Sequence, residues 1–197
     1  MKFSWPWLLK PVVFFLCLSP FVYLLTGIIT ENLGANPVEY LTRSTGDWSL
    51  RFILIVLLVT PLRKITGWHF LVKLRRMLGV FTFFYVTNHL LIYAILDLGL
   101  DWSHLAEDIL ERPYITVGFS AWLLLIPLAV TSTNKMIRIL GKRWKQLHKL
   151  VYLIGMLGVV HYWWLVKKDL REPIIYAAIF IVLMAMRLYK KSPQAKR

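Results

Sequence analysis

The sequence has a single cysteine and few acidic residues. Cys17 is the only thiol among 197 residues, which excludes an intramolecular disulfide, a cysteine-held iron–sulfur cluster and a haem attached through C-x-x-C-H. Only ten acidic residues stand against 24 lysines and arginines, and none lies in the long apolar segments. A metal cofactor within those segments must therefore be held by histidine, and a haem there must be non-covalent.

What the sequence has in abundance is apolar residues, which make up 58% of the chain. This composition is typical of a multi-spanning membrane protein, in which each spanning helix needs about 20 mostly apolar residues. Arginines flank the shorter segments and can extend them by snorkelling. We predict an all-α membrane protein, a six-transmembrane-helix bundle forming one domain over residues 1–197, with these spans: Pro11–Thr30, Phe52–Leu62, Met77–Leu96, Pro113–Asn134, Leu150–Val166 and Pro173–Met186.

The distribution of charge predicts the orientation of these helices. If the N-terminus is cytoplasmic and the chain crosses six times, most basic residues lie on the inner side and all ten acidic residues lie on the outer side. Both termini are then cytoplasmic. The net charge of +14 is explained by this topology and by contact with anionic lipid, so a nucleic-acid partner is not expected.

Two of the five histidines lie deep in apolar segments that run from the inner to the outer side. His89 lies 14 residues past Arg75, and His161 lies 13 residues past His148, which is about 20 Å along each helix axis. Both histidines are therefore expected at similar depth, where they can supply the two axial ligands of one haem iron. The alternative is a pair of histidines that bond backbone carbonyls or each other.

His148 lies near the inner edge, at the depth of Arg75 and Arg76. Because a helix turns by about 100° per residue, Arg75 lies within about 40° of the face of His89, whereas Arg76 points away from it. Arginine stays protonated and is a poor iron ligand, but its planar fork suits a carboxylate such as a haem propionate. We therefore place His148 and Arg75 at a second, inner haem site.

The angular difficulty at the inner site is that His148 and His161 would lie on different faces of one ideal helix. The 13 residues between them turn the helix by about 220°, so the two side chains would not point to the same neighbouring helix. Helix tilt, distortion near Gly155 and Gly158, or a helix that begins after His148 would each remove the difficulty.

Several segments carry a resemblance to a known family. RRMLGVFTFFYVTNHLLIY, LGKRWKQLHKLVYL and VVHYWW resemble the ferric reductase-like transmembrane superfamily. LGANPVEYLTRSTG, ERPYITVG and TSTNKMIRILGKRW are similar, more narrowly, to the haem-binding membrane subunits of bacterial periplasmic methionine sulfoxide reductase systems. The resemblance covers nearly the whole chain. The superfamily often has histidine where Arg75 stands, which leaves the identity of the inner ligand open.

The resemblance implies a multi-pass b-type cytochrome of the bacterial inner membrane. It implies one haem b or two, with His89 and His161 as axial iron ligands and His148 at a further haem site, and it adds FMN as a second type of cofactor. Electrons would come from the quinone pool or a cytosolic flavin reductase. They would pass to a periplasmic molybdopterin subunit that reduces methionine sulfoxide in proteins. This chain would be the electron-transfer subunit of that heterodimer and not its catalytic subunit.

Two loops are expected to serve these partners. The basic inner segment KMIRILGKRWKQLHK suits anionic lipid or an anionic electron donor such as the flavin reductase. The acidic outer segment DLGLDWSHLAEDILERP, with an interfacial helix, is the expected docking face for the periplasmic subunit.

Two other functions compete with this interpretation. A stand-alone transmembrane reductase of extracellular metal ions would need an exposed outer haem edge and no partner. A small proton-coupled transporter would use the histidines as a proton relay. Against the transporter, the sequence predicts no acidic residue inside any helix and no pair of broken helices.

Overall fold

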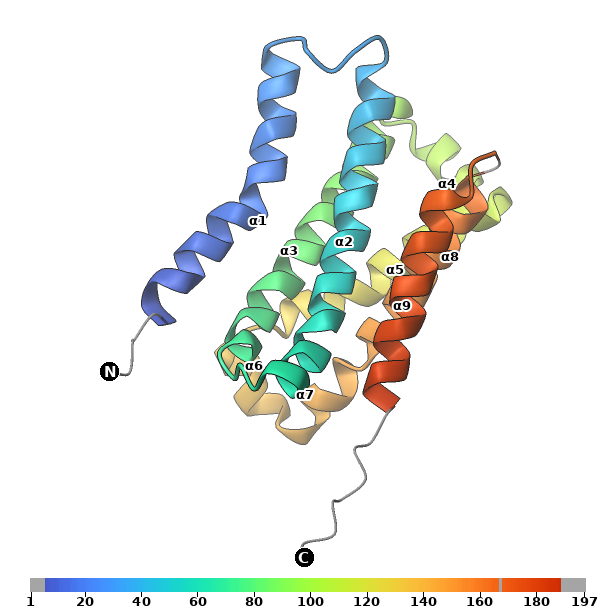
Figure 1. Ribbon diagram of the computed structural model, residues 1–197. Coiled ribbons are helices and arrows are strands. Elements are labelled where there is room, and N and C mark those ends of the chain that lie inside the picture. The colour runs from blue at the N-terminus through green and yellow to red at the C-terminus, as the bar shows by residue number, and fades with distance from the viewer. Residues whose placement is uncertain (1–5, 167, 189–197) are drawn as a thin grey trace, which may run out of the picture.

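The computed structural model describes residues 6–166 and 168–188, and its regular structure in those ranges is helical, without a strand. The longer helices form a bundle (Figure 1), and shorter elements connect them. The long elements are α1 (Pro6–Ile29), α2 (Pro37–Thr66), α3 (Leu71–Ile92), α5 (Pro113–Val130), α8 (Leu150–Leu165) and α9 (Arg171–Leu188). The short elements are the π-helical turn η1 (Tyr93–Asp97), α4 (Trp102–Glu111), α6 (Asn134–Leu140) and α7 (Lys142–Leu147).

Three of the described helical stretches are long and apolar enough to cross a membrane, namely Leu8–Ile29, Leu71–Asp97 and Pro113–Val130. The predicted all-α class is confirmed. The count of six crossings is not settled by length and composition, because the other long helices are shorter or carry more charge.

The bundle is built from two closely packed helix pairs, α2 with α3 and α5 with α8. α9 packs on α2 and α8, and α1 lies at the edge, beside α3 (Figure 1). The start of α1 and the end of α9 lie towards the same end of the bundle as α6 and α7, whereas α4 lies at the opposite end (Figure 1).

α2 is longer than the predicted span Phe52–Leu62, because it begins at Pro37 and ends at Thr66. The helix is 30 residues long because strong signals fix both ends. The side chain of Asn36 caps the N-terminus by accepting from the backbone N–H of Glu39 at 3.2 Å, and proline follows at the first helical position. Gly67 ends the helix in the left-handed conformation, with φ 72°.

The longer α2 brings polar side chains into the bundle. Thr42, Thr45 and Ser49 each donate to the carbonyl oxygen four residues earlier, at 2.7–2.9 Å, so their hydroxyls are satisfied within the helix. The extension also places Asp47 in the helix, next to its i+4 partner Arg51 at 3.8 Å. The expectation that the helices carry no acidic residue is therefore wrong, although the apolar part of α2 still has none.

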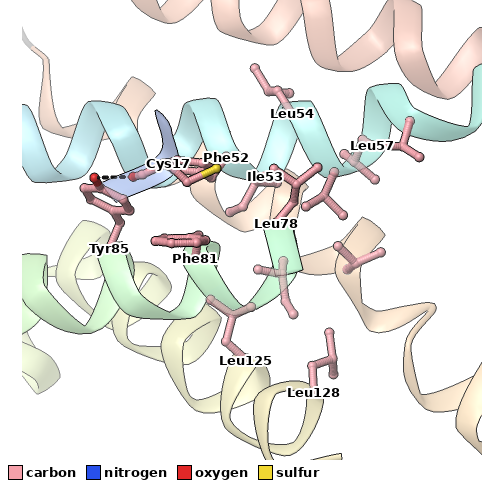
Figure 2. Packing of buried hydrophobic residues seen from close by; sticks show 14 of the residues in the cluster. Cys17, Phe52, Ile53, Leu54, Leu57, Leu78, Phe81, Tyr85, Leu125 and Leu128 are labelled. Carbon is pink, nitrogen blue, oxygen red and sulfur yellow. Dashed lines mark hydrogen bonds between the residues drawn. The ribbon is translucent and has the colours of Figure 1, made fainter. Parts of the chain in front are cut away.

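The core lies between α2, α3, α5 and α8 (Figure 2). Tyr85 is fully buried there and stacks on Phe52, with ring centres 4.9 Å apart. Its hydroxyl donates to the carbonyl oxygen of Cys17 at 2.8 Å and accepts from the N–H of Phe21 at 3.1 Å. The hydroxyl thus lies between a carbonyl and an N–H group that would otherwise bond each other within α1. Pro20 already weakens the hydrogen bonding of the helix at this point. This contact attaches α1 to the rest of the bundle.

The expected interfacial helix is α4, and a buried carboxylate holds it in place. Asp108 is 3% exposed and accepts from the hydroxyl of Tyr93 and from Nε of Arg112 at 2.9 Å. Asp101 caps the helix by accepting from the backbone N–H groups of residues 103 and 104. His104 lies on the exposed side of α4.

Candidate functional site

His89 of α3 and His161 of α8 lie side by side in the bundle. Their ring centres are 6.2 Å apart and the ring planes cross at 80°. The two helices belong to different pairs, so the histidines meet at the junction between α2–α3 and α5–α8. The predicted proximity of the two side chains is confirmed. Their binding of iron stays a prediction.

Each imidazole donates a hydrogen bond to a backbone carbonyl of the partner helix in its pair. Nδ1 of His89 lies 2.9 Å from the carbonyl oxygen of Thr42 in α2, and Nδ1 of His161 lies 2.6 Å from that of Tyr114 in α5. A carbonyl oxygen can only accept, so both Nδ1 atoms must carry the proton. Nε2 of each neutral ring then keeps its lone pair, which is the arrangement of a metal-binding histidine oriented by an outer partner.

Glycines on the facing helices let the two rings come this close. A Cβ at Gly118 of α5 would lie 2.7 Å from Nδ1 of His161, and a Cβ at Gly46 of α2 would lie 3.1 Å from Cε1 of His89. Each glycine follows the accepting carbonyl by four residues. A helical carbonyl points along the axis towards the residue four positions on. A ring that bonds this carbonyl must therefore pass directly over that residue, where a side chain would block it.

The geometry fits one metal held between the two rings. Two imidazoles bound through Nε2 on opposite sides of one metal, with bonds of about 2.0–2.1 Å, would have ring centres about 6 Å apart. The observed separation is 6.2 Å. The alternative, in which the rings only bond carbonyls, accounts equally for both Nδ1 atoms.

In the part of the chain that the structure describes, two histidine side chains meet at this site. Among residues 6–166 and 168–188, no group of three or more histidine, cysteine or acidic side chains is placed to hold a metal ion. A simple zinc site requires three or four protein ligands. Two imidazoles from facing helices would instead suit a haem, whose macrocycle provides the remaining ligands of the iron.

His148 lies at the turn between α7 and α8, before α8 begins at Leu150. Of the three explanations left open for the angular difficulty, a helix that begins after His148 is the one observed. Nδ1 lies 3.1 Å from the carbonyl oxygen of Trp144, whose ring stacks on the imidazole at 3.9 Å. Nε2 is buried and makes no well-formed hydrogen bond among the described residues, although the carbonyl of Leu128 also lies close to the ring. With Nδ1 protonated, the lone pair of Nε2 could bind a metal or accept from a donor group.

Arg75 is half-buried and close enough to His148 to interact with it electrostatically. Arg76 is exposed and its side chain donates to Asn134 at the start of α6. Arg75 is thus the less exposed of the two arginines, and its role at a cofactor stays a prediction. No ion pair joins Arg75 to a side-chain carboxylate of the described residues.

Sequence reasoning missed the roles of Gly46, Gly118 and Arg187. Both glycines lie inside the segments LGANPVEYLTRSTG and ERPYITVG that carry the narrower family resemblance. A glycine inside a helix lowers the stability of the helix by about 1 kcal/mol relative to alanine. A glycine at such a position therefore indicates that close packing leaves no room for a side chain. Arg187 was assigned only to the membrane interface, yet its Nε is also buried without a partner among the described residues.

Comparison with known proteins identifies the family of this chain. Residues 45–159 match the family described as ferric reductase like transmembrane component. Three similar proteins are each named protein-methionine-sulfoxide reductase heme-binding subunit MsrQ. The protein from Herminiimonas arsenicoxydans is 48% identical over 92% of this chain and 85% of its own length. The Ralstonia nicotianae protein is 51% identical over 90% and 83%. The Polaromonas naphthalenivorans protein is 50% identical over 97% and 90%.

The family match covers more than half of the chain and includes His89 and His148, while His161 lies two residues beyond its end. The relatives extend the similarity over nearly the full sequence. This chain belongs to the ferric reductase-like transmembrane family and, within it, to the MsrQ proteins.

Proposed function

We propose that this chain is a membrane b-type cytochrome that passes electrons outward across the bacterial inner membrane. It is the electron-transfer subunit of an oxidoreductase and carries out no substrate chemistry of its own. The observation that carries the proposal is the pair of imidazoles of His89 and His161, whose ring centres lie 6.2 Å apart and whose Nδ1 atoms both donate to carbonyls, so that the Nε2 lone pairs stay available to a metal. The relatives' names describe those proteins as heme-binding.

The proposed topology has six crossings with both termini in the cytoplasm. In support, α1 begins and α9 ends towards the same end of the bundle (Figure 1). The basic elements α6 and α7 lie at that end, and the acidic helix α4 lies at the other. An even number of crossings with the basic end inside fits this arrangement.

At the outer site, His89 and His161 are the proposed axial ligands of a haem b. At the inner site, His148 would ligate a second haem and Arg75 would pair with a propionate, or the two side chains would contact FMN. Haem supplies one-electron redox chemistry when it is bound. The protein's part is to fix the tautomer and direction of each imidazole and to keep water from the site. The carbonyls of Thr42 and Tyr114 perform the first of these tasks.

The relatives' names place those proteins in a methionine sulfoxide reductase. For this chain we infer a heterodimer with a periplasmic molybdopterin subunit that reduces methionine sulfoxide in proteins. The electron donor is the quinone pool or a cytosolic flavin reductase. The proposed docking face for the periplasmic subunit is the outer end around α4, where Glu107 and Glu111 are exposed. The basic α6–α7 end faces the membrane lipid and the donor.

A stand-alone metal-ion reductase and a proton-coupled transporter remain the competing functions, and no feature of the site favours either. Asp47 in α2 is a carboxylate that the sequence prediction did not place in a helix, and it lies 3.8 Å from its i+4 partner Arg51.

Purified protein tests the proposal directly. It should be red, with a Soret band and b-type peaks on reduction, and its haem should be removable by acid acetone because no thiol attaches it. Colourless protein from cells supplied with a haem precursor would contradict the proposal. Membranes that also hold the periplasmic subunit should oxidise this haem when methionine sulfoxide is added, and a metal-ion reductase would not require that subunit.

A further inference from the structure

Arg187, near the end of α9, reaches into the bundle instead of pointing to solvent. One terminal nitrogen donates to the carbonyl oxygen of Leu57 in α2, and the other donates to the hydroxyl of Tyr152 in α8 at 2.9 Å. The guanidinium carbon lies 5.1 Å from the centre of the Tyr152 ring. Nε is buried and has no hydrogen-bond partner among the described residues.

One of these contacts has a structural reason. Four residues after Leu57 stands Pro61, which has no N–H and therefore leaves the Leu57 carbonyl without its helical donor. Arg187 replaces that donor. This task needs one N–H group and no net charge, so it explains neither the choice of arginine nor the orphaned Nε.

The charge around Arg187 is unbalanced. Arg75 is close enough to act electrostatically on both Arg187 and His148, and its charge has the same sign as that of Arg187. All ten side-chain carboxylates of the chain lie among the described residues, and none forms an ion pair with Arg75 or Arg187. Like charges that are partly buried without a counter-ion are costly, which indicates that the counter-ion comes from outside the chain.

We infer that Arg187 and Arg75 together bind the acidic group of a cofactor whose ring system lies at His148. The inference rests on the proposed inner site and adds Arg187 to it as a positioning residue. The chemistry of the ligand group is a carboxylate or a phosphate, because both accept the parallel N–H groups of a guanidinium. A haem propionate and the phosphate of a flavin nucleotide share this chemistry.

The three side chains come from different parts of the chain. Arg75 lies on α3, His148 precedes α8 and Arg187 lies on α9. A ligand that bridges them would join α9 to the two helix pairs at the inner end of the bundle. Its removal should therefore loosen α9 as well as leave two unpaired cations.

The test uses the full-length protein and separates the two tasks of Arg187. Arg187→Gln keeps an N–H group for the Leu57 carbonyl and removes the charge. Arg187→Lys keeps the charge and removes the fork. Pro61→Ala restores the helical donor for Leu57, so the double variant Pro61→Ala/Arg187→Gln no longer needs Arg187 for structure. Pro61→Ala alone is the matched control, and thermal unfolding of each variant in detergent reports folding.

Each purified variant is assayed for haem per protein and for flavin released on denaturation, and the midpoint potential of any retained inner haem is measured. We expect Arg187→Gln to lose most of the inner haem or of the flavin, Arg187→Lys to retain part of it, and the outer haem to keep its two-imidazole spectrum. The double variant should regain thermal stability but not the cofactor. A loss confined to haem identifies a propionate as the bound group, and a loss confined to flavin identifies a phosphate.

Full cofactor retention in Arg187→Gln, or its recovery in the double variant, would show that Arg187 only replaces the donor missing at Pro61, and would overturn the inference. So would a wild-type protein that holds the outer haem but neither an inner haem nor a flavin. If the wild-type protein binds no haem at all, the proposed function itself fails.

Discussion

The imidazole of His161 lies so close to the backbone of Gly118 that a Cβ at this position would come within 2.7 Å of Nδ1. His89 and Gly46 form the same arrangement with slightly more room, at 3.1 Å from Cε1. In both pairs the ring bonds a carbonyl four residues before the glycine. The two histidines are thus oriented by the same device, once in each helix pair.

Gly118→Ala should therefore weaken haem binding at the outer site. Alanine is the better helix former by about 1 kcal/mol, so the helix itself should not suffer. The ring must move away from the added methyl group and lose the Tyr114 carbonyl, and loss of such an outer partner typically weakens metal binding about 10–100-fold. Haem per protein after purification and the rate of haem transfer to apomyoglobin measure the effect.

Gly79→Ala is the matched control, because a Cβ at Gly79 in α3 meets nothing within 4 Å. It should bind haem as the unchanged protein does. Gly46→Ala should be milder than Gly118→Ala, since a shift of a few tenths of an ångström relieves its contact. If Gly118→Ala holds haem as firmly as Gly79→Ala, the close approach does not position the imidazole.

Removal of either proposed ligand should remove most of the outer haem. His89→Ala and His161→Ala each take away one of the two imidazoles that would hold the haem, and water is a poor substitute for imidazole. Each variant should insert normally, lose most of the outer haem and stop electron delivery to the periplasm. The double variant should be little worse than either single one, because the two ligands act as a unit. A variant that keeps a low-spin, two-imidazole spectrum would show that its histidine is not a ligand.

The depth argument succeeded because it uses only the rise of a helix, which hardly varies. Counting residues from Arg75 and His148 placed His89 and His161 at one level, and the structure brings them within 6.2 Å. Rotation about the helix axis was harder to predict. The break between α7 and α8 at His148 changes the direction of that side chain, and hydrophobic periodicity does not register a two-residue turn.

The N-terminal half of α2 escaped prediction because hydropathy cannot distinguish a polar loop from a helix whose hydroxyls are satisfied internally. Thr45 and Ser49 are buried, yet each donates to a carbonyl of its own helix. The cap at Asn36 was present in the sequence, followed by proline and, three residues later, by Glu39. These signals alone would have extended the helix.

The inner site can be tested independently of Arg187. Arg75→Ala should leave an inner cofactor loosely held, and Arg75→Lys should rescue only part of the binding because a point charge lacks the planar fork. His148→Ala should remove an inner haem and leave the outer one. Haem per protein and the two-step redox titration report both changes. Unchanged haem content in His148→Ala would mean that this histidine only ends α7.

The outer helix α4 depends on Asp108, whose carboxylate joins Tyr93 to Arg112. Asp108→Asn keeps the shape but loses the charge, and should cost about 1–3 kcal/mol because buried donors lose a charged acceptor. Hydrogen exchange of α4 should accelerate while the core stays protected. The exposed Asp97 provides a control, and Asp97→Asn should leave exchange unchanged. If α4 stays protected in Asp108→Asn, the carboxylate does not hold it.

The final prediction concerns the proposed orientation of the helices in the membrane. All ten acidic residues should lie on the periplasmic side, and most lysines and arginines should lie inside, since the distribution of basic residues governs insertion. A reporter that is active only in the periplasm should be silent when fused after Arg197. The same reporter inserted after Gly34, in the exposed turn between α1 and α2, should be active. Activity at the C-terminus would mean an odd number of crossings or a reversed orientation. The outer haem would then lie on the wrong side to serve a periplasmic partner, even with both imidazoles in place.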